Sequence, residues 1–153
     1  KALYNDVSGL SNQTNKVSST YPAFNAAYNY LSTAHPTGSS SWFLPSCGQW
    51  WDAMEKANTK KDGSSLTIAS YHNTESSAGN WVSGDYKALT ALNALMSNYS
   101  GLTYTAIGDH GYWAGSEWNT SNACGLNFSS SSGLVFNGYG KTLTYYVRPF
   151  LAF

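Results

Sequence analysis

Apolar residues recur at helical spacing in three parts of the chain, and each part predicts a helix. The first runs from Pro22 to about Ala34, because proline is favoured in a first helical turn. The second runs from Cys47 to about Asn58, and the third from an Asp85 cap through Met96. The residues expected to face inward are Phe24, Ala27, Tyr28 and Leu31 in the first helix, Trp50, Ala53, Met54 and Ala57 in the second, and Leu89, Leu92, Leu95 and Met96 in the third.

The second helix has a sequence signal for its start. The apolar stretch "WFLPS" (Trp42 to Ser46) predicts a short strand that the proline ends. Ser46 and Gln49 then match a capping box, in which the serine caps the helix and the glutamine side chain reaches back. The polar stretch from Asn58 to Gly84 predicts a long loop.

From Gly111 onward the spacing changes to short strand-like segments separated by glycine and serine. The segments are "YWAGS", "ACGLNFS", "GLVFN" and "YYVRPFLAF", and the last, Tyr146 to Phe153, predicts a buried strand. Helices first and antiparallel strands last indicate an α+β fold, with the helices on one side of a small twisted sheet. The length of 153 residues fits one domain, 1–153.

The charge pattern excludes several functions. Charged residues make up 10% of the chain, the formal net charge is zero, and Arg148 is the sole arginine. Nucleic acid needs many phosphate-neutralising cations, so it is excluded as a partner. No apolar stretch approaches the ~20 residues of a membrane helix, so direct membrane insertion is not expected.

The cysteines and histidines match no catalytic or metal-binding pattern. Cys47 and Cys124 have no CxxC or Cys/His neighbourhood. Two unpaired cysteines are the default expectation, and a bridge between them stays open as the alternative. The motifs GxSxG, HExxH and GxxxxGK[ST] are absent. His35, His72 and His110 lie in loop-like sequence and are expected at the surface.

The acidic residues do not predict a catalytic pair. Asp52 and Glu55 lie three apart on the second helix, where solvated surface is the expected role. Glu117 follows the aromatic "YWAGS" segment and is favoured as a structural anchor that accepts backbone hydrogen bonds, with ligand binding as the alternative. The sequence predicts no catalytic residue, no metal site and no cofactor.

The stretch from Tyr112 to Tyr146 has the composition of a binding surface. Tyr, Ser, Gly and Asn supply 19 of its 35 residues, and only Glu117 and Lys141 carry charge. Antibody paratopes use the same residues, because aromatic rings give rigid contact area and small polar residues adapt their hydrogen bonds. The alternative is an ordinary turn-rich sheet whose aromatic residues form the core. Because side chains in a strand alternate between its faces, about half of the aromatic rings in this stretch should be buried.

Three segments carry a family resemblance. "WFLPSCGQWWDAM", "YWAGSEWNTSNACGLNFSSSSG" and the terminal "YYVRPFLAF" resemble bacterial C-type-lectin-like domains, especially the variable proteins of diversity-generating retroelements, over roughly residues 42–153. The resemblance implies a C-type-lectin-like fold that displays a variable, ligand-facing region, about residues 112–146, on a rigid scaffold. It implies no calcium site here, because the Glu-Pro-Asn motif is missing and Glu117-Trp118-Asn119 lacks a following aspartate.

The resemblance also assigns roles to residues. It implies that the framework consists of Trp113, Glu117, Asn127, Phe128, Val147, Arg148, Pro149 and Phe153. It implies that the ligand-facing set consists of Trp118, Asn119, Thr120, Ser121, Cys124, Leu126, Leu134, Phe136, Asn137, Tyr139, Leu143, Thr144 and Tyr145.

The expected function is therefore non-enzymatic recognition of a protein or cell-surface ligand, by a domain that is secreted, displayed on a bacterial surface or part of a phage particle. One alternative is a structural module of a pilus or phage tail, in which the aromatic residues mediate self-association. The other is an oxidase similar to formylglycine-generating enzymes, which use two nearby cysteines. Cys47 and Cys124 lie in unrelated segments, which argues against that activity.

Overall fold

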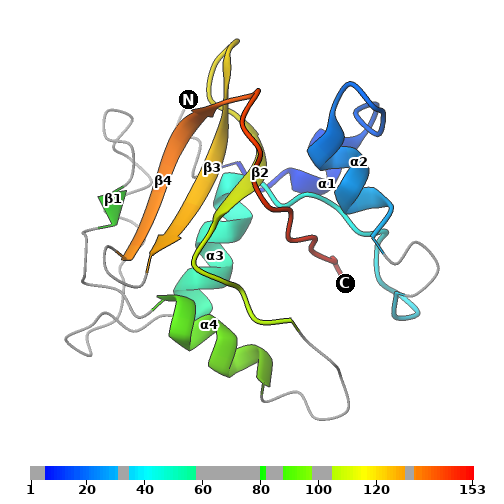
Figure 1. Ribbon diagram of the computed structural model, residues 1–153. Coiled ribbons are helices and arrows are strands. Elements are labelled where there is room, and N and C mark those ends of the chain that lie inside the picture. The colour runs from blue at the N-terminus through cyan, green and yellow to red at the C-terminus, as the bar shows by residue number, and fades with distance from the viewer. Residues whose placement is uncertain (1–5, 31–34, 58–79, 82–87, 98–104, 130–132) are drawn as a thin grey trace.

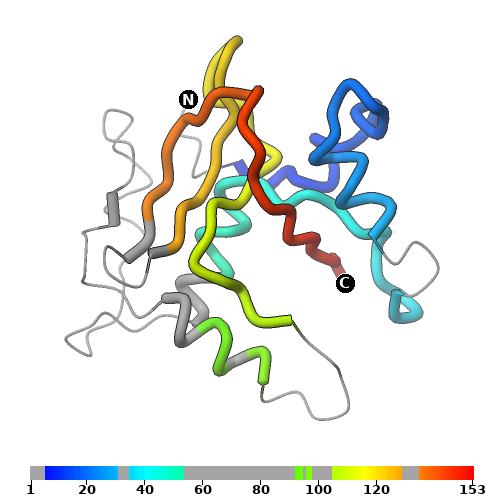
Figure 2. Tube along the Cα trace, viewed as in Figure 1, coloured from blue at the N-terminus to red at the C-terminus, as the bar shows by residue number. Residues whose placement is uncertain are grey.

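A computed structural model of the chain describes residues 6–30, 35–57, 80–81, 88–97, 105–129 and 133–153 (Figures 1 and 2). Four strands form one antiparallel sheet in the order β1-β4-β3-β2, so the protein has a small α+β fold. The helices and strands are α1 (Gly9–Gln13), α2 (Pro22–Tyr28), α3 (Cys47–Ala57), β1 (Asn80–Trp81), α4 (Ala88–Ser97), β2 (Gly111–Glu117), β3 (Asn122–Ser129) and β4 (Gly133–Gly140). No helix in the described ranges is long and apolar enough to cross a bilayer.

The main core lies between α3 and one face of the sheet, which we call the inner face. Alternate residues of β3 point toward α3, because side chains in a strand alternate between its two faces. These residues are Cys124, Leu126 and Phe128, and Leu126 pairs with Phe136 of β4. They pack against Trp50 and Trp51 of α3, which are both fully buried.

The start of α3 confirms the predicted capping box. Ser46 N donates to Gln49 Oε1 at 3.0 Å, and Gln49 N lies 3.4 Å from Ser46 Oγ. The same glutamine oxygen accepts from Gly9 N at 3.1 Å, so the cap also holds α1 in place. The chain segment before it, predicted as a strand, forms only a single bridge between Phe43 and Phe150.

The short helix α1 was not predicted, and polar contacts hold it against the rest of the molecule. Gln13, at its end, is 3% exposed. Its Oε1 accepts from Leu44 N at 3.1 Å, and its Nε2 donates to Trp42 O at 2.9 Å. Since these bonds join residues about thirty positions apart, hydropathy spacing gives no signal for them.

The helices do not all lie on one side of the sheet, which corrects the predicted arrangement. In Figure 1 α3 stands behind the sheet, whereas α1 and α2 lie beside β2. Ala23, Phe24 and Ala27 of α2 pack in a second cluster with Trp113 and Ala123, which face away from the main core. We call this opposite side of the sheet the outer face.

The last residues are extended but are not the buried strand that was predicted. Tyr146 and Phe150 each form one isolated bridge, to Tyr112 and Phe43 respectively. Tyr146 is 58% exposed and Phe153 is 90% exposed. The apolar run is divided between two neighbours, β2 and the segment before α3, so its side chains are only partly covered.

Cys47 and Cys124 form a disulfide, which corrects the expectation of two unpaired cysteines. The bond joins the first residue of α3 to the middle of β3, and both residues are fully buried. It fixes α3 to the inner face across 77 positions of sequence. Sequence spacing did not predict it, because the pairing depends on the packing of the helix on the sheet.

The remaining helix predictions are confirmed in part. The first predicted helix ends at Tyr28, earlier than expected, and Tyr28, predicted to face inward, is 42% exposed. The other two helices are found as α3 and α4. Leu92 is buried in the core and Met96 packs against it. The predicted loop 58–84 is wrong at Asn80–Trp81, which form β1. The rest of that loop, the cap Asp85, and the side chains of Leu31, Met54, Ala57, Leu89 and Leu95 lie outside the described residues.

Candidate functional site

Three aromatic rings pack against one another on the outer face of the sheet. The ring of Trp113, from β2, lies 4.8 Å from that of Tyr145, and Tyr145 lies 4.9 Å from Tyr139 of β4. Trp113 is largely covered, whereas both tyrosines are partly exposed. Tyr145 reaches this face from the C-terminal segment and therefore joins that segment to the sheet.

Two glycines allow the tyrosine rings to lie close to the backbone of the sheet. A Cβ at Gly125 would be 2.8 Å from Tyr139 Cδ2 and 3.3 Å from Tyr145 Cε2. A Cβ at Gly111 would be 2.9 Å from the Tyr145 ring. Any larger residue at either position would push the rings off the backbone, so the glycines form the floor of the aromatic group.

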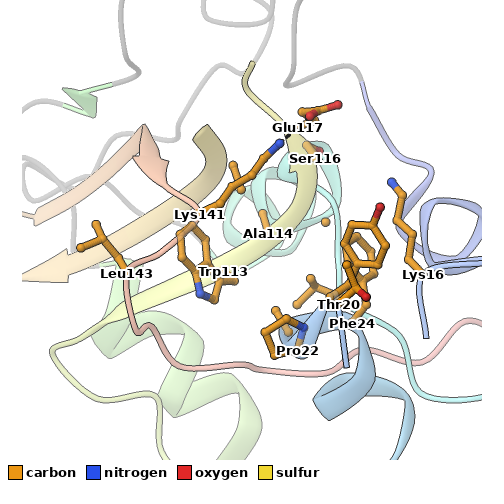
Figure 3. Close-up of a pocket in the computed structure, with 15 residues that line it drawn as sticks. Lys16, Thr20, Pro22, Phe24, Trp113, Ala114, Ser116, Glu117, Lys141 and Leu143 are labelled. Atoms are coloured by element: carbon orange, nitrogen blue, oxygen red, sulfur yellow. Dashed lines mark hydrogen bonds and ion pairs between the residues drawn. The ribbon is translucent and has the colours of Figure 1, made fainter. Parts of the chain in front are cut away.

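Next to Trp113 the outer face opens into a cavity of about 320 Å³ between α2 and the β2–β3 pair. Figure 3 shows Trp113 and Leu143 on one side of it and Pro22, Phe24 and Thr20 on the other. Most of its lining is apolar. The full lining comprises Lys16, Thr20, Tyr21, Pro22, Ala23, Phe24, Leu44, Trp113, Ala114, Gly115, Ser116, Glu117, Ala123, Lys141 and Leu143.

The charged groups of the cavity lie around its mouth. Lys141 Nζ is 2.5 Å from Glu117 Oε1 and donates to Thr120 O at 3.0 Å. This hydrogen bond, together with the positive charge of Lys141, holds the pKa of Glu117 below its usual value. Lys16 Nζ lies 5.1 Å from the centroid of the Phe24 ring, in a cation–π contact.

The two outer-face tyrosines are uncharged at physiological pH. Burial, together with the neighbouring Tyr145, raises the pKa of Tyr139 to about 12. Burial also raises the pKa of Tyr145. Both side chains therefore offer a neutral ring with a hydroxyl that can donate and accept hydrogen bonds.

Most of the predicted ligand-facing residues are accessible, but they are not all on one face. Tyr139, Tyr145 and Asn137 are partly exposed on the outer face, with Leu143 and Thr144 exposed in the turn beyond β4. The exposed turn between β2 and β3 holds Asn119, Thr120 and Ser121, and Asn119 Oδ1 accepts from the Ser121 and Asn122 amides. The side chain of Leu134 lies outside the described residues.

Trp118 is partly buried and lies away from the aromatic group. A Cβ at Gly138 would be 2.5 Å from its ring, and Gly138 pairs with the inner-facing Cys124. Directly paired residues of antiparallel strands share a face, so Trp118 covers the end of the inner face.

The ligand-facing assignment is wrong for three residues, because Cys124, Leu126 and Phe136 are each fully buried. Leu126 and Cys124 lie two and four positions before Phe128, a predicted framework residue. The three residues therefore share one face of β3. Phe136 pairs with Leu126 and is buried with it. Strict alternation from Phe128 would have placed the β3 residues inside.

Some of the predicted framework residues are buried or hold segments together, and others are exposed. Phe128 is buried, Trp113 is nearly so, and Val147 packs with the second cluster. Arg148 donates to Thr105 O at 2.7 Å and thus ties the C-terminal segment to the chain before β2.

The framework assignment does not fit three exposed residues, Glu117, Asn127 and Phe153. The sequence favours Glu117 as an anchor that accepts backbone hydrogen bonds. Its side chain is instead 63% exposed and accepts from Lys141 Nζ. Phe153 is 90% exposed.

The N-terminal third contributes one side of the cavity, which sequence reasoning missed. Lys16, Tyr21 and Phe24 line it, although the predicted ligand-facing region covers only residues 112–146. The available signal was weak: Tyr21 and Phe24 lie three apart around a helix start, with Pro22 between them. Nothing in their spacing indicates that they would meet Trp113.

Outside this face, the described residues offer few groups for chemistry. His35, His110 and Asp52 are exposed, as predicted, whereas His72 and the Glu55 side chain are outside the described residues. His110 stacks on Tyr146, with ring centroids 4.4 Å apart. Among the described residues, no three His, Cys, Asp or Glu side chains are grouped to hold a metal ion.

Comparison of the chain with known protein families, curated proteins and solved structures finds no match.

Proposed function

We propose that this protein is a non-enzymatic recognition domain of the C-type-lectin-like kind, and that it binds a protein or cell-surface ligand through its outer face. The observation that carries the proposal is the group Trp113, Tyr145 and Tyr139, held over two glycines beside an apolar cavity. Binding energy in interfaces is concentrated in a few Trp and Tyr anchors, and such a group supplies them.

A rigid support strengthens this proposal. The strands that carry the rings are fixed from behind by the Cys47–Cys124 disulfide and by the Trp50–Trp51 core. Aromatic anchors lose little conformational entropy on binding when their rings are already held by packing. The surrounding exposed residues, including Asn119, Thr120 and Thr144, are small and polar and suit adaptable hydrogen bonding.

The C-type-lectin-like part of the proposal rests on where the resembling segments lie. The first covers the start of α3 and the second covers β2 and β3. The terminal segment pairs with β2 and with the chain before α3. A disulfide persists in oxidising compartments, which supports a secreted or surface-displayed protein.

The oxidase alternative has less support, although the structure brings its two cysteines together. Both are in a disulfide and fully buried, so neither presents a thiolate to a metal ion or substrate. The acid nearest the cavity mouth, Glu117, is engaged by Lys141 and has a lowered pKa, which is opposite to the shift a general acid needs.

The test begins with selection of ligands for the purified domain, from a random peptide library and an immobilised glycan panel. We expect the Tyr139→Ala variant to bind the selected ligands with about 2 kcal/mol less free energy. Trp118→Ala, on the other face, should leave affinity unchanged. Unchanged affinity in both variants would show that the outer face is not the binding site. Concentration-dependent self-association, with no ligand selected, would favour the alternative of a structural module.

A further inference from the structure

We infer that the cavity beside Trp113 takes one large apolar side chain from a partner polypeptide, with an adjacent carboxylate of that partner paired to Lys16. This inference rests on the proposed recognition function and specifies the ligand at the cavity end of the outer face. It is carried by the composition of the cavity, the state of the neighbouring sheet edge and the charges at the mouth.

The walls of the cavity select an apolar group. Phe24, Pro22 and Tyr21 form the side contributed by α2 and its start, and Trp113 and Leu143 stand opposite (Figure 3). The volume of about 320 Å³ is at the lower end of the range for ligand pockets, roughly 300–1,000 Å³. It therefore suits a single ring-bearing or branched side chain better than an extended ligand.

The edge of the sheet beside the cavity is already occupied, so a partner strand cannot be added there. Trp113 N donates to Tyr146 O at 2.9 Å, and Gly115 N donates to Pro45 O at 2.8 Å. The carbonyl of Gly115 accepts from Asn12 Nδ2 at 3.3 Å. Since the backbone groups of β2 are taken at these positions, recognition here depends on side chains entering the cavity.

The charges at the mouth favour an acidic neighbour. Two ammonium groups and one carboxylate line the cavity, which leaves one net positive charge. Lys141 is engaged by Glu117 and by Thr120 O. Lys16 contacts the Phe24 ring and makes no ion pair among the residues that the structure describes. A carboxylate next to the inserted side chain would pair with Lys16 at the rim.

Three blocked dipeptides serve as probes: acetyl-Asp-Phe-amide, acetyl-Asn-Phe-amide and acetyl-Asp-Ala-amide. Titrated into ¹⁵N-labelled protein, the first should shift the Gly115 and Ala123 amide resonances saturably. It should bind about threefold tighter than the Asn peptide, because a partly exposed ion pair contributes an affinity gain of that order. The Asp-Ala peptide should produce no saturable shift. Lys16→Gln should make the Asp-Phe and Asn-Phe affinities equal.

Two matched pairs of variants locate the binding. Ala23→Leu fills the cavity and should abolish the shifts, whereas Ala26→Leu, exposed on the same helix, should preserve them. Leu143→Glu places a repelling charge at the mouth and should weaken Asp-Phe binding at least threefold. Thr142→Glu, exposed next to it and outside the lining, should not. Thermal unfolding of each variant checks that it is folded.

The outcomes separate this inference from the proposed function. Saturable shifts that map to Asn137 and Tyr145 instead of Gly115 and Ala123 would overturn the inference and leave the outer face as a binding site. Binding unaffected by Ala23→Leu and Leu143→Glu, or no saturable shift with any peptide, would also overturn it. The proposed function fails separately, if ligands selected on the whole domain are indifferent to Tyr139→Ala.

Discussion

Tyr139 lies over Gly125 so closely that a Cβ at residue 125 would be 2.8 Å from Tyr139 Cδ2. The contact joins the middle of β3 to the end of β4 and places the tyrosine ring against the sheet, next to Tyr145. The Tyr139 ring can take this position because Gly125 has no side chain. In our account this arrangement fixes the recognition surface before any ligand arrives.

Gly125→Ala should displace Tyr139 and Tyr145. Inserting a methyl group into this contact should lower the free energy of unfolding by about 1–3 kcal/mol. Gly140→Ala is the matched control, because a Cβ there has no neighbour closer than 3.9 Å. It should change stability by less than about 0.5 kcal/mol. Urea unfolding of the two variants provides the measurement, and equal effects would show that the rings do not depend on the glycine floor.

Removal of the disulfide should destabilise the protein strongly. The bond closes a loop across 77 positions, for which the loop-entropy relation gives about 4.5 kcal/mol. The Cys47→Ala/Cys124→Ala double variant should lose stability of that order in urea unfolding. Free-thiol titration of the denatured wild-type protein should find no thiol. Two reactive thiols, with stability unchanged in the double variant, would contradict the bridge.

Gln13→Ala should destabilise the attachment of α1. The substitution leaves Leu44 N and Trp42 O without their partners, and each unsatisfied group costs about 1–3 kcal/mol when buried. Ser11→Ala, exposed on the same helix, is the control and should have little effect. Thermal unfolding compares the two, and a Gln13→Ala midpoint equal to that of the control would show that these bonds are unimportant.

Stability should fall at alkaline pH because of Tyr139. Its pKa is raised to about 12 in the folded protein, against the ordinary value of 10.0. Below pH 10 the side chain is protonated in both states, so its contribution is complete. Between pH 10 and about 12 the unfolded chain loses the proton first and binds fewer protons than the folded chain, so the free energy of unfolding decreases.

The measurement is the absorbance titration of phenolate, taken as wild type minus Tyr139→Phe. The difference should have a midpoint near pH 12, and Tyr139→Phe should reduce the loss of stability above pH 10. A difference midpoint near pH 10 would show that Tyr139 is not protected by its surroundings.

The elements with strong local signals could be predicted from the sequence. The capping pair Ser46 and Gln49 located the start of α3, and the alternating segments from Gly111 to Gly140 located three strands. These predictions succeeded because the interactions join residues close in sequence. The buried set of β3 was also within reach, since alternation from Phe128 places Leu126 and Cys124 inside.

The rest depends on contacts between distant segments. The Cys47–Cys124 bond, the attachment of α1 and the cavity between Phe24 and Trp113 have no local pattern. The terminal segment shows a second limit. A fully apolar run predicts burial, but Tyr146 and Phe153 remain exposed because their neighbours cover only part of the segment.

Two adjacent tyrosines provide the most direct test of the central claim, that the outer face binds the ligand. Tyr145 packs with Trp113 and Tyr139 on that face, whereas Tyr146 stacks on His110 and contacts Tyr112. The affinity of one selected ligand should be measured for Tyr145→Ala and Tyr146→Ala by calorimetry. We predict a loss of about 2 kcal/mol for Tyr145→Ala and little change for Tyr146→Ala. Equal losses, or a loss for Tyr146→Ala alone, would contradict the account.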